Sequence, residues 1–283
     1  MSQVAFGDQR WLIAIDIDGT LVDYESNLSH QTRDEVMRVR ALGHEVVLAT
    51  GRSAANAIPA LFDVGIDSGH AVCSNGAVTI EIDPADPQGY RPSEIVTFDP
   101  QPILSQLSVN LPNAHFAVED IDGTYRYHRP FPAYALGEKN IETPLEELMH
   151  QPVSRVVVLS PEHEVDEFAQ AITSIGLSSV SYSIGYTSWL DIAPFGVTKA
   201  SALEKLRRMH QIKPEQVIVI GDGRNDIPMF EWAQAQGGLA FAMGQAADET
   251  KRAATAVTAP IEEHGVAQVL RDFEGILFTR KML

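Results

Sequence analysis

Three short apolar runs, each ending in a cluster of polar residues, constrain the fold of this chain more than any other feature. The runs are Trp11–Ile15, Glu45–Ala49 and Val217–Ile220. Short unbroken runs of Val, Ile, Leu and Ala are typical of strands that are buried on both faces of a parallel sheet. Helical spacing of apolar residues marks Ser29–Leu42 and Thr198–His210. This alternation of strands and helices predicts an α/β fold with a Rossmann-like, doubly wound parallel sheet at its core.

The polar clusters that follow the three runs begin at Asp16, Thr50 and Gly221. Ligands bind outside the carboxyl ends of the strands in such sheets, so we expect the clusters to meet at one edge. Asp16 and Asp18 are two residues apart, and side chains alternate along a strand, so both carboxylates can face the same opening. Like charges buried so close together require a cation, and Mg²⁺ suits carboxylate ligands. Asp222 is a candidate to complete this metal site.

The order of these motifs resembles that of the haloacid dehalogenase-like phosphatases. Asp16–Val22 is similar to the first motif of that family, Thr50–Arg52 to the second, Lys199 to the third and Gly221–Asp226 to the fourth. A narrower resemblance, to the Cof-type branch (subfamily IIB), rests on four further short segments: Ser74–Ala77, Gly196–Lys199, Ala242–Gly244 and Glu263–Ala267.

The resemblance implies a role for each catalytic candidate. Asp16 would be the nucleophile that attacks phosphorus and forms an aspartyl-phosphate. Asp18 would protonate the leaving alcohol and then activate water, while its backbone carbonyl binds the metal. Lys199 would neutralise Asp16 and the transferring phosphoryl group. Asp16, Asp18 and Asp222 would form the Mg²⁺ site.

The resemblance also implies a phosphate-binding set that surrounds the nucleophile. Thr50 would hold a phosphate oxygen through its hydroxyl, and Gly51 belongs to the same motif. Lys199 and Asn225 would complete the set. Asp226 would lie behind it and support either the metal ligands or Lys199.

The middle of the chain predicts a second, α+β domain inserted into the first. Thirty-four positions separate Asp16 from Thr50 and leave no room for an insertion, whereas 149 separate Thr50 from Lys199. An insertion after the second motif resembles the C2 cap type, in the C2B form of Cof-like enzymes. We expect the core to comprise residues 1–83 and 189–283, and the cap to comprise residues 84–188. Four prolines within Asp83–Gln101, and a fifth at Pro102, favour a crossover between the two.

A second copy of the first motif's five residues occurs at Asp120–Thr124. Alternating residues follow it, and Asp122-Gly123 between two strands is a strong hairpin signal. We therefore expect a structural turn there, with contact between the hairpin tip and substrate as the alternative.

Composition excludes several classes of function. Lys and Arg total 21 and Asp and Glu total 38, which gives a net charge of −17 and disfavours nucleic acid or an anionic membrane as the partner. Cys73 is the one cysteine, so the chain has no internal disulfide framework. Apolar runs are too short to span a bilayer, and we expect a cytoplasmic protein. The sequence leaves the oligomeric state open.

The favoured function is that of a Mg²⁺-dependent phosphomonoester hydrolase acting on a small phosphorylated metabolite, such as a sugar phosphate or a phosphorylated cofactor. A phosphotransferase or mutase of the phosphomannomutase-like kind is the first alternative, because it shares the nucleophile and the C2 cap. A non-catalytic module that binds a phosphorylated ligand is the second, and the presence of Asp16, Asp18 and Lys199 disfavours it.

Overall fold

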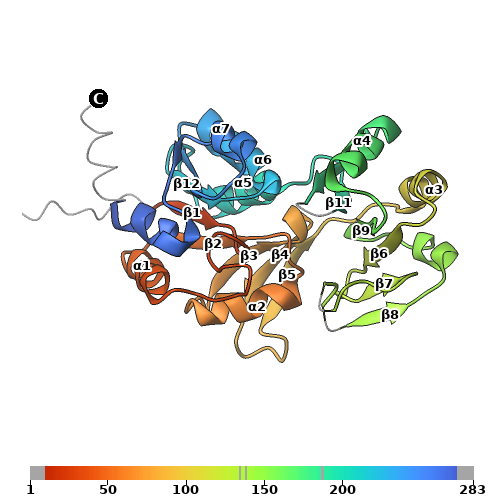
Figure 1. The fold of residues 1–283 in the computed structure, drawn as a ribbon. Coiled ribbons are helices and arrows are strands. Elements are labelled where there is room, and N and C mark those ends of the chain that lie inside the picture. Colours follow the sequence, from red (N-terminus) through yellow and green to blue (C-terminus); the bar gives the residue numbers. More distant parts are fainter. Residues whose placement is uncertain (1–9, 134, 138, 186–187, 273–283) are drawn as a thin grey trace, which may run out of the picture. The chain divides into compact units, whose positions relative to one another are not determined.

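A computed structural model describes residues 10–133, 135–137, 139–185 and 188–272 (Figure 1). These residues fall into two compact units. The first unit comprises residues 10–49, 60–71 and 203–272, and the second comprises the described residues of 50–59 and 72–202. Among the described residues, no helix combines the length and apolar character needed to cross a bilayer.

The first sheet has eight strands in the order β14-β13-β12-β1-β2-β3-β4-β5. β1 pairs in parallel with both β2 and β12, which sets Ile15 level with Leu48 and Ile220. All residues of these three strands are buried, as the apolar runs predict. The strands are β1 (Leu12–Ile15), β2 (Glu45–Ala49), β3 (Gly69–Cys73), β4 (Val78–Ile82), β5 (Tyr90–Ile95), β12 (Val217–Gly221), β13 (Leu239–Ala242) and β14 (Ala256–Val257).

Helix α1 shows how local sequence sets the ends of the elements. It begins after Ser29, whose hydroxyl accepts a hydrogen bond from the Thr32 amide at 3.1 Å, and ends before Gly43, whose φ is +90°. These features are an N-cap and a left-handed C-terminal residue. The helices associated with the first sheet are α1 (His30–Ala41), α2 (Ala54–Asp63), α5 (Lys199–Met209), α6 (Ile227–Ala235) and α7 (Asp248–Ala253).

The second sheet has six strands in the order β10-β11-β9-β6-β7-β8 and lies entirely in the second unit. Its hydrophobic core includes Leu104 and Phe168, from the two helices of that unit, and Phe116 and Val158 from the strands, so both helices cover one face. The elements are α3 (Gln101–Asn110), β6 (His115–Glu119), β7 (Tyr125–Tyr127), β8 (Asn140–Glu142), β9 (Arg155–Leu159), α4 (Val165–Ile175), β10 (Val180–Ile184) and β11 (Trp189–Pro194).

Short 3₁₀ helices fill four of the connections in the described part of the chain. The sequence of Pro144–His150 predicts a regular helix, but only a 3₁₀ helix over Leu145–Met149 is present there. The sequence of Gly265–Phe273 also predicts a helix, which is present over residues 265–272; Phe273 lies outside the described residues. The four are η1 (Ser74–Gly76), η2 (Leu145–Met149), η3 (Arg224–Asp226) and η4 (Ile261–Glu263).

The second copy of the first motif forms the turn between β6 and β7, as predicted. The Asp120 amide donates to the Thr124 carbonyl at 2.9 Å, and Gly123 has φ +80°. Asp120 accepts two hydrogen bonds from the Arg126 guanidinium, at 2.7 and 2.8 Å. This carboxylate is therefore used within the hairpin.

The chain leaves the six-stranded sheet later than the sequence indicates. Trp189–Pro194 was expected to lie in the core, but as β11 it pairs with β9 and β10. Its mixture of apolar and polar residues fits an antiparallel strand as well as a parallel one, which is why the pattern did not distinguish the two sheets.

Candidate functional site

Three buried carboxylates meet in the first unit. Asp16 directly follows β1, Asp222 directly follows β12, and Asp226 ends η3. One carboxylate oxygen from each lies within 4.8 Å of the others, and the three residues are 5%, 3% and 0% exposed. Buried carboxylates at this spacing repel one another and lack the solvation of water, so an oxygen-ligand site for a hard divalent ion fits them.

Neutral donors hold two of these carboxylates in place. Asp222 accepts hydrogen bonds from the Thr20 hydroxyl at 3.2 Å and the Tyr24 hydroxyl at 2.8 Å. Asp226 Oδ2 accepts from the backbone amides of Asp222 at 3.0 Å and Gly223 at 2.9 Å. Asp226 thereby fixes the loop that carries Asp222. Its carboxylate also belongs to the acidic cluster.

Two glycines allow this close packing. A Cβ atom on Gly19 would lie 2.3 Å from Asp222 Oδ2, and Gly19 has φ +77°. A Cβ atom on Gly221 would lie 2.4 Å from the Asp226 side chain. Because each glycine lacks a side chain, a carboxylate can occupy the space beside its Cα atom.

Asp18 and Asn225 lie in the same two loops as the cluster. Asp18 is exposed, and its backbone forms an isolated bridge with Val22. The three-carboxylate cluster does not include the Asp18 side chain. Asn225 lies in η3 and is partly exposed.

Thr50 and Gly51 belong to the second unit. Thr50 directly follows β2, is fully buried, and accepts a hydrogen bond through its hydroxyl from the Arg52 amide at 3.0 Å. Its backbone carbonyl accepts from the Asn75 amide at 3.0 Å, and the Arg52 carbonyl accepts from the Ser74 amide at 2.8 Å. The loop after β2 is thus fixed along its length by backbone contacts.

Lys199 is the first residue of α5 and has no exposed surface, although it carries an ammonium group. The helix start is fixed by reciprocal hydrogen bonds between Thr198 and Ser201, at 3.0 and 3.3 Å. A Cβ atom on Gly76 would lie 2.2 Å from the Thr198 carbonyl oxygen, so η1 packs directly against this start. Because an ammonium is expensive to bury unless anionic or hydrogen-bonding groups meet it, this position is unlike that of a surface lysine at a helix start.

A buried polar network in the second unit was not predicted from the sequence. Arg155 donates to the Gly51 carbonyl at 2.7 Å, to the Tyr125 hydroxyl at 3.1 Å and to Asp191 at 2.8 Å. Glu119 accepts from the Ser74 hydroxyl at 2.7 Å and from Tyr125 at 3.0 Å. In the sequence, this network is indicated only by Arg155, a charged residue beside the apolar residues of β9.

Burial dominates the titration of this network. Desolvation raises the pKa of Glu119, against the attraction of the Arg155 guanidinium, which lowers it. Burial also raises the pKa of the Cys73 thiol, and the Glu119 charge adds to this effect. Cys73 is therefore a thiol held away from its reactive form, in agreement with a buried core residue.

A small cavity in the second unit lies on the side of the six-stranded sheet where Tyr127, Phe131 and Leu136 pack against Ala117 and Val157. Tyr127 and Phe131 line it together with Leu136 and Asn140. Trp189 packs edge-to-face on Phe131, with the ring centroids 5.6 Å apart. The lining combines aromatic rings with polar atoms, which suits a ring that carries polar groups.

Comparison with known proteins bears on both units. A family model described as haloacid dehalogenase-like hydrolase matches residues 13–270. The chain is 27% identical over 269 residues to 5-amino-6-(5-phospho-D-ribitylamino)uracil phosphatase YitU of Bacillus subtilis, with 93% of this chain and 97% of that protein covered. It is 25% identical over 280 residues to pyridoxal phosphate phosphatase YbhA of Escherichia coli, with 92% and 97% covered.

A solved structure extends the likeness to the fold. The subclass IIB sugar phosphatase BT4131 superposes with a TM-score of 0.77 at 24% identity, covering 93% of this chain and 99% of that one. These matches confirm the family resemblance and the α/β fold class predicted from the motifs.

Proposed function

The chain belongs to the haloacid dehalogenase-like hydrolases, and from this membership we propose that it is a Mg²⁺-dependent phosphomonoester hydrolase. The substrate is a small phosphorylated metabolite, either a sugar phosphate or a phosphorylated cofactor. The observation that carries the proposal is the buried cluster of Asp16, Asp222 and Asp226, whose carboxylate oxygens lie within 4.8 Å of one another. Two relatives are named as phosphatases of a phosphoribityl compound and of pyridoxal phosphate, which agrees with this substrate class.

The first chemical step uses Asp16 and Asp18. An Asp16 carboxylate oxygen attacks phosphorus, the bond from phosphorus to the leaving oxygen breaks, and Asp18 gives a proton to that oxygen. In the second step, water attacks the aspartyl-phosphate as Asp18 takes its proton. Inorganic phosphate leaves and Asp16 is regenerated.

The remaining residues bind and orient the reacting groups. Thr50, Gly51 and Asn225 hold the phosphate oxygens, and Lys199 balances the charge of Asp16 and the phosphoryl group. Asp16, Asp222 and the Asp18 carbonyl would hold Mg²⁺, and Asp226 supports that set. When bound, Mg²⁺ offsets the negative charge that gathers on the carboxylates and the transferring group.

The inserted domain, which carries the six-stranded sheet and includes β11, selects the leaving group. The cavity lined by Tyr127 and Phe131 supports this, because its aromatic walls suit the ring of a sugar or a cofactor. A C2B-type cap in this position is also what the subclass IIB likeness leads us to expect.

Release of free phosphate tests the proposal. We would assay the purified chain against phosphorylated sugars, nucleotides and cofactors, with Mg²⁺ and with a chelator. Turnover that requires Mg²⁺ and is abolished in Asp16→Asn is expected. Asp120→Asn is the matched control, because this aspartate occupies the same place in the copied motif but serves the β6–β7 hairpin. Formation of an isomer in the presence of a bisphosphate, with no phosphate release, would instead favour the mutase.

A further inference from the structure

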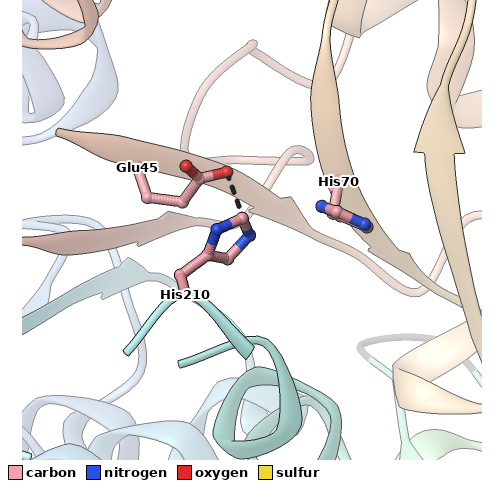
Figure 2. Close-up of side chains that lie close together, drawn as sticks. All are labelled: Glu45, His70 and His210. Atoms are coloured by element: carbon pink, nitrogen blue, oxygen red, sulfur yellow. Dashed lines mark ion pairs between the residues drawn. The ribbon is translucent and has the colours of Figure 1, made fainter. Parts of the chain in front are cut away.

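A second group of potential metal ligands lies in the first unit, away from the acidic cluster. Figure 2 shows Glu45, the first residue of β2, with His70 from β3 and His210, which directly follows α5. Asp16 and Asp222 follow the carboxyl ends of β1 and β12, whereas Glu45 and His70 lie at the amino ends of β2 and β3. The length of β2 corresponds to about 13 Å, so the two groups are separate sites.

The geometry of this group is close to that of a metal site. One potential ligand atom from each residue lies within 4.8 Å of the others. His210 Nε2 is 3.6 Å from Glu45 Oε1, and two atoms bound to one tetrahedral zinc ion are separated by about 3.3 Å. The two imidazole rings meet edge-to-face, with centroids 5.4 Å apart, so they are not stacked on one another.

Burial makes the group costly without an ion. The side chains of Glu45 and His210 are 9% and 16% exposed. His210 Nε2 is buried and makes no hydrogen bond to any residue in the part of the chain that the structure describes. At 3.6 Å, its separation from Glu45 is also longer than a hydrogen bond. An ion between these atoms would bind both the histidine nitrogen and the carboxylate oxygen Oε1.

We propose that Glu45, His70 and His210 bind a divalent transition-metal ion, with Zn²⁺ as the ion of best fit. Two imidazole nitrogens and one carboxylate oxygen match zinc, whereas Mg²⁺ and Ca²⁺ require oxygen ligands. The three residues come from segments far apart in sequence. Binding in the folded state alone therefore stabilises the fold by tying β2, β3 and the segment after α5 together.

Arg10 modulates the site. Its guanidinium forms an ion pair with Glu45 Oε2, and its side chain is 48% exposed, while Oε1 faces His210. The carboxylate can thus bind an ion through one oxygen and keep Arg10 on the other. Removing Arg10 leaves the whole carboxylate charge for the ion and strengthens binding.

Thermal unfolding and calorimetric titration of the full chain test the site without any assay of activity. After treatment with chelator, Zn²⁺ at about 100 times its dissociation constant is expected to raise Tm by about 5 °C or more, and Mg²⁺ is expected to give no such shift at matched concentration. Titration should give one Zn²⁺ per chain. His70→Gln and His210→Gln should each abolish both signals, and Arg10→Gln should strengthen binding.

Two controls separate this site from others. His30→Gln removes an exposed histidine at the start of α1 and should leave Zn²⁺ binding unchanged. Asp222→Asn disables the proposed catalytic metal site and should also leave it unchanged, so failure of the phosphatase proposal does not affect the outcome. Absence of a Zn²⁺-dependent shift in the parent chain would overturn the inference. A Zn²⁺-dependent rise in Tm that is as large in His70→Gln and His210→Gln as in the parent chain would overturn it as well.

Discussion

Gly19 and Asp222 lie so close together that any side chain at Gly19 would overlap the Asp222 carboxylate. A Cβ atom there would be 2.3 Å from Oδ2, and the φ of +77° disfavours any other residue. The glycine of the first motif is thus required by the aspartate of the fourth, which is 203 positions later in the chain.

Gly19→Ala should therefore impair catalysis through Asp222. We expect kcat/KM to fall by about tenfold or more, which corresponds to about 1.4 kcal/mol of transition-state stabilisation, and the apparent affinity for Mg²⁺ to fall with it. Gly43→Ala is the matched control, since Gly43 also has positive φ but nothing lies within 4 Å of its added Cβ. Both variants should lose about 1 kcal/mol of stability, and only Gly19→Ala should lose activity. Equal activity in the two would refute this link.

Arg155 should position the phosphate-binding loop. Because it donates to the Gly51 carbonyl, Arg155→Lys, which keeps the charge but loses the forked donors, should raise KM for phosphorylated substrates by about tenfold, with a smaller change in kcat. Steady-state kinetics would measure the split. Arg126→Lys changes a comparable ion pair in the β6–β7 hairpin and should leave KM unchanged. If both variants, or neither, alter KM, the role of Arg155 is only structural.

Some parts of the fold and the site can be predicted from the sequence, because residues close together along the chain determine them. Apolar runs identified β1, β2 and β12, and helical spacing over Ser29–Leu42 identified α1, because these signals depend on neighbouring residues. The placement of Asp16 and Asp222 together follows from the parallel pairing of β1 with β12.

Other parts could not be predicted. Proline in a sequence indicates a loop, but Pro59 lies inside α2 and Pro92 lies in the edge strand β5. A strand at the edge of a sheet tolerates proline, because one side of it pairs with no other strand and the missing N–H costs no hydrogen bond there. The Arg155 network joins residues that are more than 100 positions apart, such as Gly51, and no local pattern encodes that contact.

Glu119→Gln should change how stability depends on pH. Burial raises the pKa of Glu119 in the folded state, so its favourable contribution is complete below the unfolded value of about 4.3 and is lost as pH rises. The glutamine variant should gain stability relative to the parent as pH increases above that value. Thermal unfolding measured between pH 4 and pH 8 tests this. A difference in Tm that stays constant across the range would contradict it.

Glu204→Gln should show the opposite slope. Hydrogen bonds from Arg207 lower the pKa of Glu204 to about 2, with contributions from Arg208 and Trp232. Its contribution is therefore present above the unfolded pKa and is lost as pH falls toward 2. At pH 7 we expect the variant to be less stable by about 1–3 kcal/mol, and the difference should shrink below pH 4.5. A difference that grows on acidification would rule out this account.

The proposed reaction requires that Asp16 become phosphorylated, and acid-quenched mass spectrometry detects this acyl phosphate. Asp18→Asn would be mixed with Mg²⁺ and p-nitrophenyl phosphate, whose leaving group needs no acid, so that phosphorylation proceeds while hydrolysis by an activated water is slowed. We predict a burst of one p-nitrophenol per chain and a phosphoryl group on the peptide that contains Asp16. A phosphoryl group on another residue, or steady phosphate release with neither burst nor modified peptide, would contradict the account.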